Sequence, residues 1–205
     1  MEKDTEFKYS SEWIHKLEAE RHWQYYHIQQ AFMDGNINKD EQLIEIGVGS
    51  SFTANYLKSK SFNVTTLDID KDKHPDIVSN IVTDDFPQGF DVVLAFEVFE
   101  HIAYQSFLDV LGKLKSRGVK KVFFSVPYNI KVWFDFDIRV HVFGRICFQI
   151  ATRRNRLTTD HHKWEIKYKN HSLKNLKTDI ETSGYRIKND ERKYSQHFFY
   201  LELEE

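Results

Sequence analysis

The chain lacks the sequence features of disulfide-rich, membrane-spanning, secreted and strongly basic nucleic-acid-binding proteins. Its single cysteine, Cys147, allows no disulfide within the chain, which fits a reducing compartment and predicts a cytoplasmic protein. No stretch approaches the roughly 18 uninterrupted apolar residues of a membrane-spanning helix. The N-terminal segment MEKDTEFKYSSEW lacks the apolar core of a secretory signal. The formal net charge of −2 gives no general attraction for nucleic acid.

The rest of the composition is that of an ordinary globular chain. With 205 residues, of which 40% are hydrophobic, the chain fits a single domain over 1–205. Aromatic residues make up 15%, and most should fill the core. A helix is expected over 10–33, where its aromatic side chains either close a cleft or simply cover a sheet.

Strand-like and helix-like segments alternate from residue 42 onward. Alternation of this kind predicts βαβ units and a parallel sheet with helices on both faces. After a helix at 171–184, two strand-like segments follow with no helix between them, so they should pair as an antiparallel hairpin. The predicted fold is a doubly wound, mostly parallel seven-stranded α/β sheet closed by this C-terminal hairpin. The five earlier strands are expected at 42–46, 62–70, 75–82, 90–97 and 120–127, and helices at 53–60 and 104–118.

Glycine is scarce, yet two of the 8 glycines lie in LIEIGVGSSF, directly after the first expected strand. Gly47 and Gly49 permit unusual backbone angles and close approach of a ligand. Asp68 ends the second strand, roughly 20 residues further on, where a carboxylate can bind ribose hydroxyls. Together these signals indicate a ribose-bearing cofactor, and the alternative is a tight turn without a ligand.

The residues around this turn favour a cationic ligand over a dinucleotide. A dinucleotide fingerprint needs a third glycine at position 52, where Phe52 stands. Glu45 would repel a pyrophosphate but suits a positive charge. S-adenosylmethionine carries a sulfonium and an ammonium group and has no phosphate.

These segments resemble the class I S-adenosylmethionine-dependent methyltransferases. LIEIGVGSS resembles the family's first motif, VTTLDID its second-strand acid, FDVVLAFEVFEHI its fourth strand and GVKKVFFSVPYN its fifth. The resemblance covers about 40–129 and 160–205. Ser51 stands in place of the family's third glycine, a departure that weakens the pattern without removing the expected cofactor, S-adenosyl-L-methionine.

The resemblance implies a set of cofactor-binding residues at the strand ends. The first turn would hold the methionine moiety, the second strand the ribose and adenine, and the third the adenine edge, for which Asp84 is a rival. The residue after the fourth strand would lie near the methionine moiety or the acceptor. The full set is Glu45, Gly47, Gly49, Asp68, Ile69, Asn80, Ile81 and Glu97.

Methyl transfer to an oxygen acceptor needs a group that removes a proton. Glu100 and His101 follow the fourth strand, and His161 and His162 lie in TTDHHKWEI before the last helix, where similar methyltransferases have an HxWE-like stretch facing the cleft. All four are candidate catalytic residues, and the alternative for each pair is a structural role. Because no cysteine pair supports the histidines, no metal is expected.

The segment 128–160 is the expected acceptor-side insertion. VWFDFDIRVHV alternates as a strand does, yet Ile138, Val142, Ile146 and Ile150 follow helical spacing. We expect an α-helical lid after a short extended segment. Its basic residues would hold a phosphorylated or acidic acceptor or contact a membrane surface through 128–157, unless they are a solvated face. They are Lys131, Arg139, Arg145, Arg153, Arg154 and Arg156.

The predicted function is methyl transfer to a small molecule, glycan or lipid-linked acceptor, with oxygen as the acceptor atom. The alternative is a regulatory module that binds the cofactor without catalysis. Nucleic acid is not the expected acceptor, because FEVF follows the fourth strand where base methyltransferases carry an Asn/Asp-Pro-Pro-aromatic signature. The sequence does not predict the oligomeric state.

Overall fold

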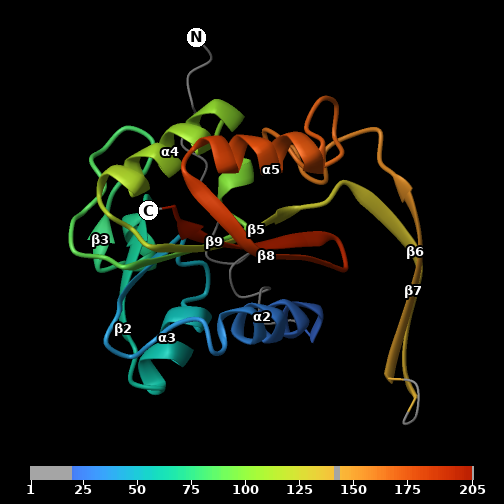
Figure 1. Ribbon diagram of the computed structural model, residues 1–205, viewed down its shortest axis with the longest axis horizontal. Coiled ribbons are helices and arrows are strands. Elements are labelled where there is room, and N and C mark those ends of the chain that lie inside the picture. Colours follow the sequence, from blue (N-terminus) through green and yellow to red (C-terminus); the bar gives the residue numbers. More distant parts are fainter. Residues whose placement is uncertain (1–19, 141–143, 205) are drawn as a thin grey trace.

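A computed structural model of the chain describes residues 20–140 and 144–204 (Figure 1). Its main sheet has seven strands in the order β3-β2-β1-β4-β5-β9-β8. The first five strands in chain order run parallel, and β9 is antiparallel to both β5 and β8. This is the predicted fold class. The strands are β1 (Gln42–Ile46), β2 (Asn63–Asp68), β3 (Ile77–Val78), β4 (Val92–Phe96), β5 (Lys121–Pro127), β8 (Tyr185–Lys193) and β9 (Gln196–Leu203).

Helices cover both faces of the sheet, as predicted. In Figure 1, α4 (Tyr104–Ser116) and α5 (Leu173–Thr182) lie on one face, and α2 (Glu20–Met33) and α3 (Phe52–Ser59) on the other. Each face has its own buried hydrophobic cluster, with Leu111 and Ile180 in one and Phe32 and Leu57 in the other. Of the helix expected over 10–33, residues 10–19 lie outside the described residues.

Two stacked aromatic pairs join β5 to β9. Phe124 stacks on its cross-strand partner Phe199, with ring centroids 4.7 Å apart, in the first cluster. Phe123 stacks on Tyr200 at 4.4 Å in the second. Aromatic pairs contribute about 0.5–1.5 kcal/mol beyond their buried area, so the antiparallel C-terminal strand is held firmly to the parallel part of the sheet.

The expected helical lid is wrong. Residues Ile130–Val140 (β6) and Gly144–Arg153 (β7) form an antiparallel hairpin that projects away from the main sheet (Figure 1). The register explains the misleading spacing, because Ile138 pairs with Ile146 and Phe134 pairs with Ile150 across the two strands. Apolar residues at paired positions of two antiparallel strands can imitate helical spacing, and the strict alternation along β6 is the signal that agrees with the structure. Val142, which belongs to the same spacing, lies outside the described residues.

None of the helices in the described part of the chain is long and apolar enough to span a membrane.

Candidate functional site

A cavity of about 570 Å³ opens at the carboxyl ends of β1, β2 and β4. The strand order reverses between β1 and β4, which is where ligands bind in doubly wound sheets. All the residues predicted from the resemblance to bind the cofactor line this cavity: Glu45, Gly47, Gly49, Asp68, Ile69, Asn80, Ile81 and Glu97. Asp84 does not line it, but its carboxylate accepts the backbone N–H of Asn80 at 2.9 Å and so supports that residue.

The turn after β1 requires glycine at its first position. Gly47 has φ 77°, and a Cβ there would lie 2.6 Å from Cγ2 of Val98. Gly49 has φ 52°, and Ser51, in place of the family's third glycine, has φ 62° and is the N-cap residue of α3. A left-handed backbone costs a residue such as serine roughly 1–2 kcal/mol, which the turn accommodates. The backbone at 47–49 therefore borders the cavity without filling it.

Asp68 joins the end of β2 to the glycine turn. Its Oδ2 accepts the backbone N–H of Val48 at 2.9 Å and a hydrogen bond from Nζ of Lys73 at 3.0 Å. Its Oδ1 accepts the backbone N–H of Asp70 at 2.8 Å. The carboxylate is thus fixed at the cavity wall, and its binding of a ribose stays a prediction. Lys73 also lines the cavity, and no motif in the sequence points to it.

Glu45 is a buried carboxyl group with an unsatisfied oxygen. Its side chain is 6% exposed, and its Oε2 has no hydrogen-bond partner among the described residues. Burial raises the pKa of Glu45 to about 8. A cation placed in the cavity would favour the ionised form and satisfy the oxygen.

Glu97 lies directly after β4 and faces the same space. The Ser125 hydroxyl donates to its Oε1 at 2.7 Å, and Nε2 of Gln196 donates to its Oε2 at 3.4 Å. Burial raises the pKa of Glu97. Ser125 and Gln196 come from β5 and β9, so only the folded sheet brings them to the site, and no local motif could have identified them.

Helix α2 closes one side of the cavity. Tyr25, Tyr26 and Gln29 line it, which supports the cleft-closing interpretation of this helix. The hydroxyls of Tyr26 and Ser50 lie 2.9 Å apart, and the Thr53 hydroxyl donates to Oε1 of Gln29 at 2.9 Å, so α2 is tied to the glycine turn and to α3.

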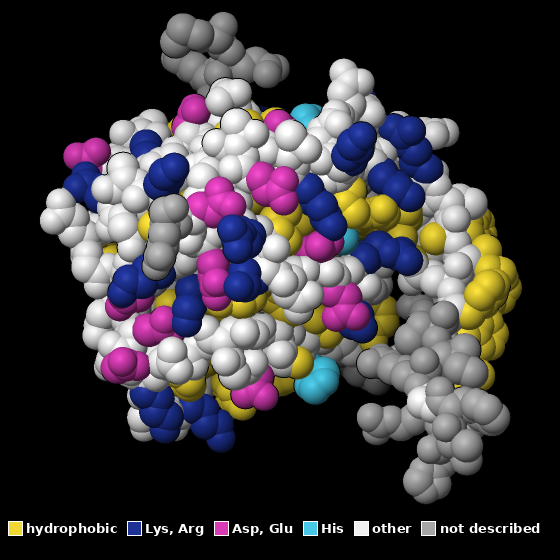
Figure 2. Space-filling view, viewed as in Figure 1, with side chains coloured by type: hydrophobic (Ala, Val, Ile, Leu, Met, Phe, Trp, Pro, Cys, Tyr) yellow, Lys and Arg dark blue, Asp and Glu magenta, His cyan; other side chains and the backbone are white. Residues whose placement is uncertain are grey.

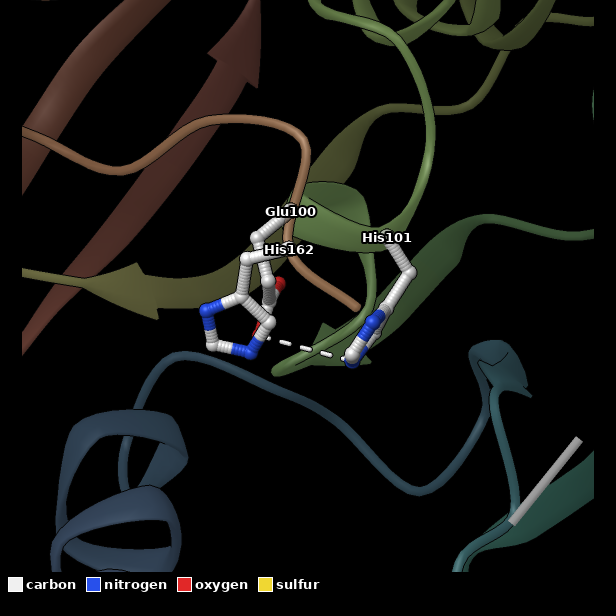
Figure 3. A group of neighbouring side chains, drawn as sticks. All are labelled: Glu100, His101 and His162. Carbon is white, nitrogen blue, oxygen red and sulfur yellow. Dashed lines mark ion pairs between the residues drawn. The ribbon is translucent and has the colours of Figure 1, made fainter. Parts of the chain in front are cut away.

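Three of the four candidate catalytic residues converge in the cavity wall (Figure 3). Glu100 and His101 come from the short helix η3 (Phe99–His101), and His162 comes from the loop before α5. Glu100 is 1% exposed, and burial and the neighbouring Glu97 carboxylate raise its pKa well above the usual value. Burial lowers the pKa of His101 to about 4, so its ring is neutral near pH 7.

The HHKWE stretch places its two histidines differently. Nδ1 of His162 lies 2.6 Å from Oε1 of Glu165, and the backbone N–H of Thr158 and the side-chain amide of Asn129 also donate to that carboxylate. Burial opposes the charge of Glu165, but these hydrogen bonds outweigh it and lower its pKa. His161 is exposed and does not line the cavity.

No family model and no curated protein matches the chain. Among solved structures, it is similar to a methyltransferase dependent on S-adenosylmethionine (SAM) from Aquifex aeolicus, with TM-score 0.64 and 13% identity over 96% of this chain and 100% of that one. It is also similar to magnesium protoporphyrin IX methyltransferase from Synechocystis PCC 6803 with bound SAM, with TM-score 0.61 and 11% identity over 97% and 87%.

A third similar structure is the 1,6-didemethyltoxoflavin-N1-methyltransferase of Burkholderia thailandensis, with bound 1,6-didemethyltoxoflavin and S-adenosylhomocysteine. Its TM-score is 0.59 at 8% identity, over 98% of this chain and 94% of that one. At such low identities the agreement concerns the fold. The chain has the fold of the class I S-adenosylmethionine-dependent methyltransferases.

Proposed function

We propose that the chain is a methyltransferase that uses S-adenosyl-L-methionine. The observation that carries this proposal is the buried carboxyl of Glu45, with its unsatisfied oxygen, in the same cavity as the Gly47 turn and Asp68. The cavity volume of about 570 Å³ lies in the range of small-molecule and cofactor sites. The fold shared with methyltransferases supports the same conclusion.

The residues of the cavity suit the separate parts of this cofactor. Glu45 would neutralise the positive charges of the methionine moiety, and Asp68 would accept hydrogen bonds from the ribose. Ile69 and Ile81 offer apolar contacts for the adenine, and Asn80 offers polar groups at its edge. When bound, the cofactor supplies a methyl group that is already activated for transfer.

We propose that the acceptor is a small molecule, glycan or lipid-linked compound that reacts through a hydroxyl oxygen. The protein must hold that oxygen close to the methyl carbon and must deal with the hydroxyl proton. Glu100, His101 and His162 line the cavity together with Glu97, and we assign the loss of the proton to this cluster. His161 is left out of it because its side chain lies outside the cavity.

A second cavity supports an anionic group on the acceptor. It has a volume of about 270 Å³, and the described residues that line it include Arg153, Lys167 and Arg192 but no carboxylate. Tyr128 lines this second cavity, and the preceding Pro127 lines the first, so neighbouring residues at the end of β5 connect the two. A phosphate held by the three cations would place the rest of the acceptor near the methyl-transfer site.

The hairpin offers an apolar surface next to this basic cavity. Phe134, Phe136, Ile138, Phe148 and Ile150 are each about half exposed. Figure 2 shows this hydrophobic band at the edge of the molecule, with Lys and Arg side chains gathered above it. Apolar and basic side chains together suit an anionic lipid surface, so among the acceptor classes we favour a lipid-linked one.

Two measurements test the proposed function. Isothermal titration calorimetry should show binding of S-adenosylhomocysteine, and absence of binding by well-folded protein would overturn the proposal. Labelled S-adenosylmethionine should then transfer its methyl group to an acceptor from a panel of hydroxylated small molecules, glycans and anionic lipid-linked glycans. Binding without transfer to any member would favour the non-catalytic module.

A further inference from the structure

Glu100, His101 and His162 form a compact group of metal-type donors (Figure 3). One carboxylate oxygen and two imidazole nitrogens lie within 4.8 Å of one another. Oε1 of Glu100 is 3.9 Å from Nε2 of His101 and 4.0 Å from Nε2 of His162. These separations are too long for hydrogen bonds. Donors that share an ion at about 2.0–2.2 Å lie at most about 4.2 Å apart, so a small side-chain adjustment completes the geometry.

The carboxylate of Glu100 is buried without compensation. The residue is 1% exposed, and neither carboxylate oxygen has a hydrogen-bond partner in the described chain. An uncompensated buried carboxyl group is costly, and such groups usually carry a partner or a metal. The side chain points toward the two imidazole rings, as Figure 3 shows. A cation between the three donors would remove the cost.

The surroundings orient both imidazole rings for ligation through Nε2. Nδ1 of His162 lies 2.6 Å from Oε1 of Glu165, which leaves Nε2 directed at Glu100. Nδ1 of His101 lies 3.4 Å from the backbone oxygen of His161. A carboxylate or carbonyl behind the ring is the usual support of a metal-bound histidine. The backbone N–H of Lys163 donates to the carbonyl of Glu100 at 2.7 Å and ties the two loops together.

We propose that Glu100, His101 and His162 bind a divalent transition-metal ion that also binds the acceptor hydroxyl. Two imidazoles and one carboxylate suit Mn²⁺, Fe²⁺, Co²⁺ or Zn²⁺ better than Mg²⁺, which prefers oxygen ligands alone. Three protein ligands leave positions open, as in catalytic rather than structural sites. The sequence predicts no metal because no cysteine pair stands beside His161 and His162. In the structure only His162 of that pair is a donor, and the other two donors, Glu100 and His101, come from η3.

This inference rests on the proposed methyl transfer and specifies how the hydroxyl proton is lost. An ion lowers the pKa of a bound hydroxyl, so the proton can pass to water without a protein base. The oxygen then forms its bond to the methyl carbon, and the electrons of the breaking carbon–sulfur bond stay on the sulfur. Acceptors with two neighbouring oxygens, which can both reach the open positions, are therefore the favoured class.

The test is titration of the EDTA-treated, buffer-exchanged full chain with MnCl₂, by calorimetry and by electron paramagnetic resonance of free Mn²⁺. We expect one Mn²⁺ per chain. His162→Ala and Glu100→Gln should each weaken binding by more than about 100-fold, and Glu165→Gln by about 10–100-fold. His161→Ala is the matched control and should bind as the wild type does. Equal affinities of His162→Ala and His161→Ala, or no binding of Mn²⁺, Co²⁺ or Zn²⁺, would overturn the proposal.

Thermal unfolding shows whether a variant loses metal binding because it no longer folds. Chelated Glu100→Gln should unfold at a temperature no lower than chelated wild type, because the substitution removes a buried acid that lacks a partner. Mn²⁺ should raise the unfolding temperature of the wild type and of His161→Ala but not that of Glu100→Gln. An equal rise in Glu100→Gln would contradict the assignment.

Binding of S-adenosylhomocysteine under chelation separates this proposal from the proposed function. Metal binding without cofactor binding would refute the methyltransferase and leave the metal site. Cofactor binding and methyl transfer that continue in EDTA, in a protein that binds no metal, would refute the metal site and leave the methyltransferase.

Discussion

Oδ2 of Asp68 lies 2.9 Å from the backbone nitrogen of Val48, so the second strand and the glycine turn meet at a single carboxylate. Replacing Asp68 by alanine should weaken S-adenosylhomocysteine binding by about 10–100-fold, because hydrogen bonds to charged groups contribute roughly 1.5–3 kcal/mol. Calorimetry measures this. Asp76→Ala is the matched control, because Asp76 accepts the backbone N–H of Thr66 on the same strand but does not line the cavity. Equal losses in both variants would mean that the effect is structural.

Gly47→Ala should destabilise the fold and impair cofactor binding together. The new Cβ would meet Val98 at 2.6 Å with φ at 77°, so about 1–3 kcal/mol of unfolding free energy should be lost. Urea unfolding measures the loss. Gly89→Ala has φ 88° but nothing within 4 Å, so it reports the backbone cost alone. If the clash with Val98 accounts for the larger loss of unfolding free energy in Gly47→Ala than in Gly89→Ala, adding Val98→Ala to Gly47→Ala should restore that difference. A double variant as unstable as Gly47→Ala would exclude the clash.

Glu45 should make the protein less stable as the pH rises. Its folded pKa of about 8 lies above the usual value of 4.5, so its contribution is complete below pH 4.5 and is lost as the pH approaches 8. The slope from this one group is at most about 1.4 kcal/mol per pH unit. Urea unfolding of the wild type and Glu45→Gln across this range should show a flatter profile in the variant. Parallel profiles would show that the carboxyl group is ionised in the folded protein.

The hairpin should bind anionic lipid vesicles. Phe136→Ser combined with Phe148→Ser removes a cross-strand pair of exposed rings and should abolish co-sedimentation with vesicles of phosphatidylglycerol and phosphatidylcholine. Lys167→Ala combined with Arg192→Ala should reduce binding to anionic vesicles and leave any weak binding to neutral ones unchanged. If the ring variant binds vesicles like the wild type, the apolar band has another partner.

The sequence predicts the features that depend on residues close together along the chain, such as single strands and turns. The first strand lies at Gln42–Ile46 as expected, because an apolar run followed by a glycine turn leaves little choice. The sequence does not reveal the hairpin, because Ile138 and Ile146 are partners in the register of two strands, a relation that only strand pairing shows.

The cavity shows the same division. The position of strand-end residues such as Asp68 at the cavity can be predicted from their spacing in the sequence. Lys73 and Gln196 line the cavity because of how the chain packs, and no sequence motif predicts their place there. The sequence cannot distinguish the neighbouring His161 and His162. In the fold, His162 is buried and lines the cavity, whereas His161 is exposed.

Within the described residues, strands β6 and β7 form a separate two-stranded sheet that shares no ladder with the main one. Residues along the hairpin can therefore change without disturbing the backbone pairing that shapes the crevice. Replacing the hairpin by a different one would therefore change which acceptor molecules the protein binds, while the residues at the strand ends that line the cavity kept their positions.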